Sequence, residues 1–394
     1  VRRAVVRPPP PAPGPLDACS MAMQQLVPML QGISCHAWNA DNSQLALCPN
    51  NNEIWIFNAS NWQRTHVLTE HDLNVSSIDW CPSNNKIVSC SHDRNAFVWT
   101  LEGGKWKPSL VILRIDRAAL DVKWSPDGLK FAVASSAKCV PVCHEDSRHD
   151  WWVSKMIKKH RSTVLCVSWH PSSQLLATGS TDNRCRIFSA YVSDVDTQQQ
   201  TGTFQTPVPF GDAYLELVAT SWVTAVAFTP SGDTLVFAAH DSTLHTVAMS
   251  GGESATAAVY RMGDLPLTCL SFLSGSCLVG AGHDMNPSIF TMEGGMFVFN
   301  SRCDKKDTSA RSNTQASGVA AARALFQNKT SRGQESKAEG DELWTKHESA
   351  ISCICRMANP TVGACPRFST SGVDGRVVTW DATTLGINTA TLGL

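Results

Sequence analysis

Six bulky aromatic residues recur along the chain at nearly constant intervals, and each closes a short run in which apolar and polar residues alternate. They are Trp38, Trp80, Trp124, Trp169, Phe228 and Phe272. Successive members of this series stand 42, 44, 45, 59 and 44 residues apart. A period of about 40 to 45 residues is typical of folds that repeat one supersecondary unit, because each unit buries its apolar face only against its neighbours. We therefore expect a repeat protein that binds partners through its loops and faces.

A second landmark in each repeat supports the same register. A turn residue is followed six positions later by a bulky one, as in Asp93 to Trp99 and Asp374 to Trp380, with a strand-like alternation between them. The same spacing separates Asn51 from Phe57, Asp182 from Phe188, Asp241 from Val247 and Asp284 from Phe290, whereas the third repeat, Ala137 to Cys143, lacks the acid. An aspartate-to-tryptophan tail at this period is typical of a WD40 blade of four antiparallel strands. Seven units can be counted, so the predicted fold class is all-β, a seven-bladed WD40 β-propeller.

The last repeat shows where the chain departs from this period. Arg356 occupies the place that Trp38 holds in the first repeat, and it lies 84 residues after Phe272. One ordinary period accounts for about 44 of these residues, so about 40 form an insertion. We place it at residues 302–343, as a long flexible loop between the sixth and seventh blades. The interval of 59 residues in the aromatic series predicts a second, smaller insertion.

The long insertion carries one segment, residues 319–328, whose alanine content favours a helix. Polar and charged stretches flank it on both sides and are expected to be flexible. On such a helix Ala322, Leu325 and Phe326 share one face. A helix this short is marginal in water by itself, so we expect a partner to stabilise it. The alternative is that the segment folds back onto the propeller.

Composition agrees with one propeller over residues 21–394. The formal net charge is −1, so nothing in the overall charge attracts nucleic acid, and no apolar stretch is long enough to span a membrane. The fifteen cysteines lack the spacing of a disulfide framework, which favours a reducing, cytoplasmic setting. Residues 1–20 are basic and proline-rich without the apolar stretch of a signal peptide, and we expect a disordered extension there. A proline-rich ligand for an SH3-type domain is the alternative for that segment.

Cys353 and Cys355 come nearest to a metal-binding motif. Residues two apart in a strand share a face, but no CxxC pair and no paired histidines accompany them. The sequence therefore favours ordinary strand packing over a zinc site, and we predict neither a metal nor a cofactor.

Polar residues that recur inside the blades are interpreted as structural. WD40 blades hold a buried hydrogen-bond chain that links tryptophan, serine or threonine, histidine and aspartate, and such a satisfied network fixes packing. The residues that fit this chain are His71, Ser89, Asp93 and Trp99 in one blade and His347, Thr370, Asp374 and Trp380 in another. A shortened set, His160, Thr178 and Asp182, ends in Phe188, which has no N–H to donate. These sets have the composition of a hydrolase triad, but they repeat by blade, and no GxSxG, Walker or HExxH motif occurs. We predict that the chain is not an enzyme.

Three longer segments are more specific than the blades. They are residues 105–119 (KWKPSLVILRIDRAA), 150–165 (DWWVSKMIKKHRSTVL) and 185–196 (CRIFSAYVSDVD). With ISCHAW at Ile33 and FQN at Phe326, they closely resemble subunit 1 of the actin-related protein 2/3 complex, the propeller subunit of the assembly that nucleates branched actin filaments. The resemblance covers about residues 26 to 394.

This resemblance implies a non-catalytic scaffold of the cytoplasm and actin cytoskeleton. Members of the family hold the other subunits of the complex together and help to engage the actin filament and nucleation-promoting factors of the WASP type. A generic WD40 adaptor, such as a ubiquitin-ligase substrate receptor, is the alternative, because it would share the blades but would not need the three segments.

Two places are predicted to contact partners. In the first, Trp151 and Trp152 stand beside Lys155, Lys158 and Lys159, and aromatic anchors with a basic rim suit an acidic protein surface. The alternative is that one tryptophan is buried and the other covers it.

The insertion is the second predicted contact. Homologues in the family present a short helix from this loop toward actin or the activator, although this chain approaches the segment through a longer serine-rich stretch. The residues onto which the resemblance carries this contact are Val319, Ala322, Arg323, Leu325 and Phe326.

Overall fold

The computed structural model describes residues 32–146, 148, 151–199, 201, 203–204, 206–304, 345–357 and 365–384. Within these residues the chain forms seven antiparallel sheets and one 3-10 helix, η1 (Met249–Ser254). The predicted N-terminal extension at 1–20 and the predicted helix at 319–328 lie outside the described residues.

Each sheet is one blade, and strands that follow one another along the chain are neighbours in the sheet. Blade 1 contains β1 (Cys35–Trp38), β2 (Gln44–Cys48), β3 (Ile54–Asn58) and β4 (Arg64–Leu68). Blade 2 contains β5 (Val75–Trp80), β6 (Ile87–Ser91), β7 (Asn95–Glu102) and β8 (Lys105–Ile112). Blade 3 contains β9 (Ala119–Trp124), β10 (Lys130–Ser135), β11 (Val140–Asp146) and β12 (Trp151–Ile157). Blade 4 contains β13 (Val164–Trp169), β14 (Leu175–Ser180), β15 (Arg184–Ser189) and β16 (Ala213–Val218).

The remaining three blades follow the same plan. Blade 5 contains β17 (Val223–Phe228), β18 (Thr234–Ala239), β19 (Thr243–Ala248) and β20 (Ala257–Arg261). Blade 6 contains β21 (Leu267–Phe272), β22 (Cys277–Gly282), β23 (Ser288–Glu293) and β24 (Met296–Arg302). Blade 7 has three strands among the described residues, β25 (Ile351–Arg356), β26 (Arg367–Gly372) and β27 (Val377–Asp381). The sequence offers residues 26–30 or 389–394 as its outer strand, and both segments lie outside the described part of the chain.

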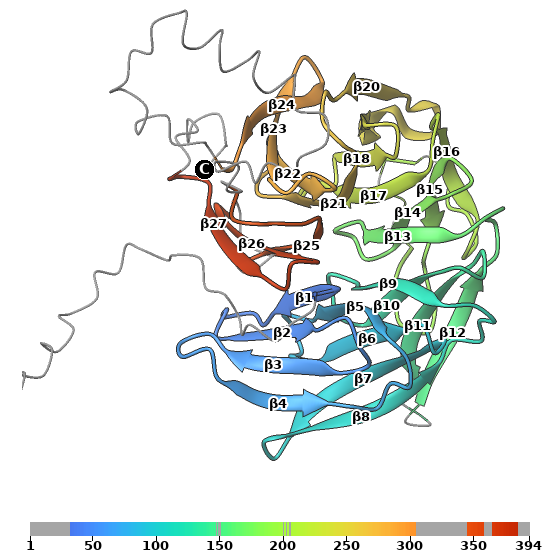
Figure 1. Ribbon diagram of the computed structural model, residues 1–394. Helices are drawn as coiled ribbons and strands as arrows, with labels where there is room; N and C mark the ends of the chain where they lie inside the picture. Colours follow the sequence, from blue (N-terminus) through green and yellow to red (C-terminus); the bar gives the residue numbers. More distant parts are fainter. Residues whose placement is uncertain are drawn as a thin grey trace, which may run out of the picture.

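The blades are arranged in a closed ring (Figure 1). The first strands of successive blades, from β1 through β5, β9, β13, β17 and β21 to β25, contact one another in turn, and β25 contacts β1 again. All the strand pairs within the blades are antiparallel, as hairpin-connected strands must be. The prediction of an all-β, seven-bladed propeller is confirmed.

The turn aspartates close the hairpins between the second and third strands of the blades. Asp93 Oδ1 accepts a hydrogen bond of 2.9 Å from the backbone N–H of Asn95, and Arg94 between them has a left-handed φ of 73°. Asp374 makes the equivalent bond of 3.1 Å to Arg376. A side chain that bonds its own backbone two residues on stabilises a tight turn, which explains why this position is so regular in the sequence.

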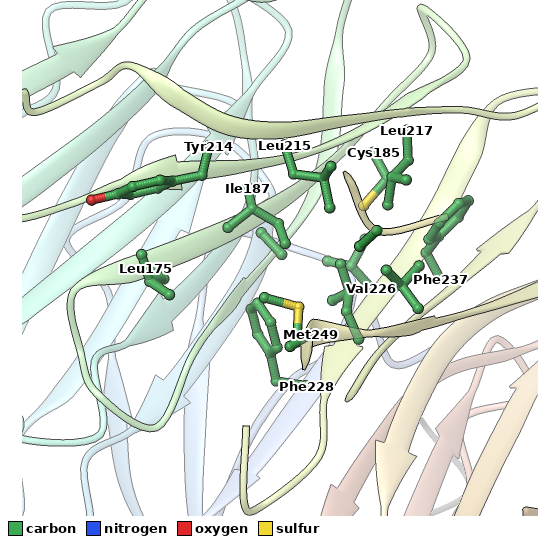
Figure 2. Packing of buried hydrophobic residues seen from close by; sticks show 14 of the residues in the cluster. Leu175, Cys185, Ile187, Tyr214, Leu215, Leu217, Val226, Phe228, Phe237 and Met249 are labelled. Atoms are coloured by element: carbon green, nitrogen blue, oxygen red, sulfur yellow. The ribbon is translucent and has the colours of Figure 1, made fainter. Parts of the chain in front are cut away.

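The hydrophobic core lies between neighbouring blades as well as within them. Figure 2 shows one such cluster, in which Ile187 and Leu215 of blade 4 meet Val226 and Phe237 of blade 5. Ile187 and Phe237 are fully buried. Because each sheet covers the apolar face of the next, a single blade has little core of its own.

The smaller insertion lies between β15 and β16, at residues 190–212. The longer one lies between β24 and β25. Arg302, where the predicted insertion begins, is still the last residue of β24, and Cys303 is buried in the core cluster between blades 6 and 7. The first two residues of the predicted insertion thus belong to the propeller, Arg302 as part of β24 and Cys303 as part of the core.

Candidate partner-binding surface

The two adjacent tryptophans of β12 point in different directions. Trp151 is 59% exposed. Trp152 is half-buried, with its ring centroid 5.9 Å from that of Trp124 and 5.2 Å from that of Phe131. Neighbouring residues of a strand face opposite sides of the sheet, so one ring packs on the core while the other stands outside. Trp151 is therefore the more exposed of the two tryptophans.

The three lysines beside these tryptophans differ in their surroundings. Lys155 Nζ lies 3.3 Å from Asp194, and Lys159 Nζ lies 3.1 Å from Asp212. Lys158 is exposed, and it forms no ion pair with any residue the structure describes. Both carboxylates come from the 190–212 loop, so this loop neutralises part of the basic rim. Ion pairs this exposed contribute little, and an acidic partner can compete for these lysines.

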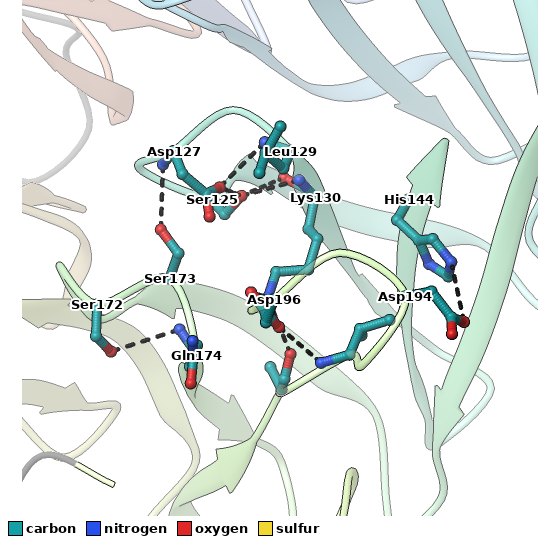
Figure 3. Close-up of polar contacts among 12 residues, drawn as sticks. Ser125, Asp127, Leu129, Lys130, His144, Ser172, Ser173, Gln174, Asp194 and Asp196 are labelled. Carbon is teal, nitrogen blue, oxygen red and sulfur yellow. Dashed lines mark hydrogen bonds and ion pairs between the residues drawn. The ribbon is translucent and has the colours of Figure 1, made fainter. Parts of the chain in front are cut away.

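A buried ion pair fixes the 190–212 loop against blade 3 (Figure 3). Lys130 of β10 is fully buried, and its Nζ lies 2.7 Å and 2.6 Å from the two carboxylate oxygens of Asp196. The same ammonium donates a hydrogen bond of 3.2 Å to the carbonyl oxygen of Ala190. Asp196 also accepts a bond of 2.7 Å from the backbone N–H of Val192. With these partners both charges are satisfied, and the loop holds Asp194 against the rim. The interval in the sequence located the loop but gave no signal that joined Lys130 to Asp196.

The two ends of the long insertion meet at one point on the propeller. Asp304, the last described residue before it, exchanges two hydrogen bonds with the side chain of Asn286, at 2.9 and 3.0 Å. Its carboxylate accepts a bond of 2.7 Å from the backbone N–H of Lys346, on the returning chain. The residues predicted to bind a partner here, Val319, Ala322, Arg323, Leu325 and Phe326, lie outside the described residues.

The hydrogen-bond chain is present in blade 2. Trp99 Nε1 donates a hydrogen bond of 2.9 Å to Ser89 Oγ, which lies 2.8 Å from His71 Nε2. His71 Nδ1 lies 2.8 Å from Asp93. The His71 and Ser89 side chains are buried, so a substrate has no access to them.

Blade 7 contains the same chain with threonine in place of serine. Trp380 Nε1 donates a hydrogen bond of 2.8 Å to Thr370 Oγ1. His347 Nε2 lies 2.7 Å from that oxygen, and His347 Nδ1 lies 2.9 Å from Asp374 Oδ2. Burial is the largest single influence on the pKa of Asp374, and it raises this pKa. The hydrogen bonds that Asp374 accepts from His347 and from backbone N–H groups together outweigh burial and hold the pKa below its usual range.

Blade 4 contains a different arrangement. His160 Nε2 lies 3.0 Å from Thr178 Oγ1, but His160 Nδ1 has no hydrogen-bond partner among the described residues. Asp182 binds the Arg186 guanidinium instead, at 2.8 and 3.1 Å. Burial, together with the Arg186 charge, lowers the pKa of His160 to about 4, so this histidine is neutral near pH 7.

A polar cluster that the sequence did not reveal joins blade 1 to blade 7. His36 is buried, and its ring nitrogens lie 2.8 Å from Ser371 Oγ and 2.7 Å from Ser369 Oγ. Trp38 Nε1 donates 2.8 Å to the same Ser369 oxygen. More than 330 residues separate these partners along the chain, so only closure of the ring brings them together.

The repeated aromatic residues surround a cavity of about 670 Å³ at the centre of the ring. Those that line it are Trp38, Trp80, Trp124, Trp169 and Phe228. Arg356, which replaces the aromatic residue in the last repeat, lines the same cavity together with Lys123 and Asp79. Five of the six aromatic residues of the sequence series therefore line one cavity.

Fourteen cysteines lie in the described residues, and all of them are free thiols. Burial raises the pKa of many of these thiols, to about 12 for Cys143 and Cys277. Cys353 and Cys355 have Sγ atoms 3.8 Å apart, and His36 brings a ring nitrogen close enough that the three potential ligand atoms lie within 4.8 Å of one another. Within the part of the chain that is described, no helix is long and apolar enough to cross a membrane.

The closed ring of seven antiparallel sheets and the internal hydrogen-bond chains define a WD-repeat β-propeller. A model of the WD domain, G-beta repeat, matches residues 62–100, 151–189 and 215–245.

Named relatives identify the family more narrowly. Actin-related protein 2/3 complex subunit 1A of Arabidopsis thaliana is 40% identical over 367 residues, which cover 92% of this chain and 97% of the relative. Subunit 1A-A of Xenopus laevis is 41% identical over 364 residues, covering 91% and 96%. Subunit 1 of Schizosaccharomyces pombe is 34% identical over 379 residues, covering 91% and 100%. The chain belongs to the family of subunit 1 of the actin-related protein 2/3 complex.

Proposed function

We propose that this chain is a non-catalytic scaffold subunit of an actin-related protein 2/3 complex and supports the nucleation of branched actin filaments. The observation that carries the proposal is identity of 40 to 41% with relatives named as subunit 1 of that complex, over nine-tenths of this chain. Its partners are the other subunits, the actin filament and nucleation-promoting factors of the WASP type, and it acts in the cytoplasm at the actin cytoskeleton.

The burial of the histidine, serine and aspartate sets supports a role without catalysis. Ser89 and Thr370 are fully buried, and each hydroxyl is already shared between a tryptophan N–H and a histidine. A nucleophile must reach the substrate, and these hydroxyls cannot. The sets stabilise the blades instead.

The face of β12 is the contact that the described residues support best. Trp151 supplies an exposed aromatic anchor, and Lys158 supplies an exposed positive charge that forms no ion pair with the described residues. Tryptophan is enriched among the residues that dominate binding energy at interfaces. An acidic segment of another subunit would complement this surface.

The insertion supports a second contact, with the actin filament or its activator. The described residues on its two sides, Asp304 and Lys346, are hydrogen-bonded to each other, so the insertion leaves and rejoins the propeller at one point. Leu325 and Phe326 are the proposed anchors. Because the insertion joins two complete strands, β24 and β25, and is not needed to build either, we expect this contact to be separable from assembly.

The native mass of the tagged chain, purified from cells of its own organism, tests the proposal. We expect a stable particle several times larger than 42.7 kDa that contains actin-related proteins. A particle that contains ubiquitin-ligase subunits and no actin-related protein would favour the adaptor function instead. A monomer would contradict both.

A further inference from the structure

Three potential metal ligands meet on the inner strands of blades 7 and 1. Cys353 and Cys355 both belong to β25, and His36 belongs to β1 beside it. Their ligand atoms lie within 4.8 Å of one another. Ring closure creates this cluster, because 317 residues separate His36 from Cys353 along the chain.

The distances suit a tetrahedral site. Zn²⁺ binds thiolate sulfur at about 2.3 Å, which places two sulfurs of a tetrahedron about 3.8 Å apart. The observed separation of Cys353 Sγ and Cys355 Sγ is 3.8 Å. Zn²⁺ binds imidazole nitrogen at about 2.0 to 2.1 Å, so the longest separation in the cluster must shorten by roughly 1 Å. Binding also replaces one serine contact of His36 and the hydrogen bond of 2.9 Å that the Cys355 thiol donates to the His36 carbonyl oxygen.

His36 has a serine hydroxyl at each ring nitrogen, so a metal ion would replace one of these two contacts. Its two ring nitrogens lie 2.8 Å from Ser371 Oγ and 2.7 Å from Ser369 Oγ. When one nitrogen binds a metal, the other keeps its serine, and such a second hydrogen bond fixes the tautomer and the orientation of a ligating histidine.

Charge also permits a divalent ion at this place. Two thiolates neutralise an M²⁺ ion, so the loaded cluster carries no net charge that burial would penalise. The neighbouring cation, Lys123, has Asp121 4.0 Å from its Nζ. Asp79 and Lys123 line the central cavity together, so this lysine has a second carboxyl group on the same wall.

The cluster has a route to solvent. Cys355 lines the central cavity of about 670 Å³, together with Lys123 and the repeated aromatic residues. An ion can therefore reach the sulfur of Cys355 without opening of the blades, and a fourth position can be filled by water from the cavity.

We propose that Cys353, Cys355 and His36 form a binding site for a thiophilic divalent metal ion of the Zn²⁺ type, with three protein ligands and a fourth position open to the central cavity. Binding releases the two thiol protons. The bound ion cross-links the first and last blades at the seam of the ring.

Titration of the full chain with Co²⁺ tests this site directly. A tetrahedral Co²⁺ ion with thiolate ligands has thiolate-to-cobalt charge-transfer absorption and intense visible bands. We expect these bands to saturate at one ion per chain and to disappear when Zn²⁺ is added. A wild-type chain that develops no such bands under a non-thiol reductant overturns the proposal.

Substitutions assign the bands to the cluster. Cys355→Ser and, separately, Cys353→Ser should weaken Co²⁺ binding at least tenfold, because loss of even an outer-shell partner of a metal site costs about 10- to 100-fold in affinity. Cys269→Ser is the matched control, since Cys269 lies on the neighbouring inner strand β21 but outside the cluster, and it should bind as the wild type does. Bands that survive both substitutions, or that are lost equally in the control, place the ion elsewhere and contradict the proposal.

A measurement on the wild-type chain decides the question even if these variants fold poorly. Zn²⁺ should protect Cys353 and Cys355 from alkylation by iodoacetamide, as read by peptide mass spectrometry. Equal labelling with and without Zn²⁺ would exclude the site.

Discussion

Trp38 donates a hydrogen bond of 2.8 Å from its indole Nε1 to the hydroxyl of Ser369, and this bond joins the first blade to the last. His36 lies 2.7 Å from the same oxygen. Nearby, the backbone N–H of Ile33 donates a hydrogen bond of 3.0 Å to the carbonyl oxygen of Gly372. The Ser352 hydroxyl donates one of 2.6 Å to the carbonyl oxygen of Ile33. The ring is thus closed at its inner seam by buried polar contacts as well as by apolar packing.

Ser369→Ala should destabilise the propeller. The substitution leaves the Trp38 N–H and a nitrogen of His36 without their partner, and a buried polar group that loses its hydrogen bond costs about 1 to 3 kcal/mol. The free energy of unfolding in urea measures this. Ser193→Ala, at an exposed position, is the control and should change stability by less than about 0.5 kcal/mol. Equal effects of the two substitutions would show that the seam bonds contribute nothing.

Stability should fall in acid because of His160. The pKa of His160 is lowered to about 4 in the folded chain, whereas an unfolded histidine titrates near about 6.5. Below about pH 6.5 the unfolded chain gains a proton that the folded chain does not bind, so the contribution is complete above that pH. It should be lost at about 1.4 kcal/mol per pH unit as the pH falls toward 4.

Comparison with a His160→Gln variant isolates this contribution, since other histidines titrate in both chains. The difference in unfolding free energy between the two chains should change between pH 6.5 and pH 4, and a constant difference would contradict the assignment.

Replacement of Trp152 by alanine should reduce stability, whereas replacement of Trp151 should reduce incorporation into the complex. Trp152→Ala removes contacts to Trp124 and Phe131 and should cost about 2 kcal/mol of stability, less than for a fully buried ring. Trp151→Ala should leave stability within about 0.5 kcal/mol of the wild type. If Trp151 is an interface anchor, its loss should weaken incorporation into the complex by about 2 kcal/mol, or roughly thirtyfold. Normal incorporation of the Trp151→Ala chain would show that Trp151 is not an interface anchor.

The long insertion should be dispensable for folding. Asp304 and Lys346 are already hydrogen-bonded at 2.7 Å, so a short glycine-serine linker in place of residues 305–344 joins them without strain. The shorter loop should stabilise the chain by no more than about 2 kcal/mol. Thermal unfolding checks this. Asn286→Ala in the shortened chain is the comparison, and it should be less stable because it removes both bonds to Asp304. Failure of the shortened chain to fold would show that the insertion packs on the blades.

Leu325→Ala combined with Phe326→Ala should separate assembly from activity. If this pair anchors a partner, the double substitution should cost a few kcal/mol of that contact, so the complex would assemble but branch actin poorly. Branching is compared with the wild type at matched activator concentration. Substitution of the polar neighbours, Asn328→Ala with Lys329→Ala, is the control and should branch normally. Unchanged branching in the Leu325 and Phe326 variant favours the fold-back alternative, and loss of assembly would show a structural role.

Features that depend on local geometry could be predicted from the sequence. The seven blades follow from the aromatic period, and the hairpins follow from turn aspartates such as Asp93, whose bond to Asn95 spans only two residues. Members of the hydrogen-bond chains are also visible, because Ser89 and Thr370 each stand ten residues before the tryptophan of their blade. A periodic pattern carries this information because each blade is a short antiparallel sheet whose strands pair with their neighbours in sequence.

Other features depend on contacts that no spacing encodes. The sequence placed Trp151 and Trp152 together on a basic rim, but only the fold separates one ring from the other. The 190–212 loop supplies Asp194 and Asp212 to that rim because the buried pair of Lys130 and Asp196 anchors it.

The sequence by itself determined how many blades this protein has, where their hairpins turn and which family it belongs to, since these are properties of short repeated segments. Only the tertiary structure decided what stands at the seam. His36 meets Ser369, Cys353 and Cys355 from more than 300 residues away, because the ring must close before the first and last inner strands become neighbours. Chain entropy opposes contacts between residues so far apart, so they form only when the packing of all seven blades brings the two ends together.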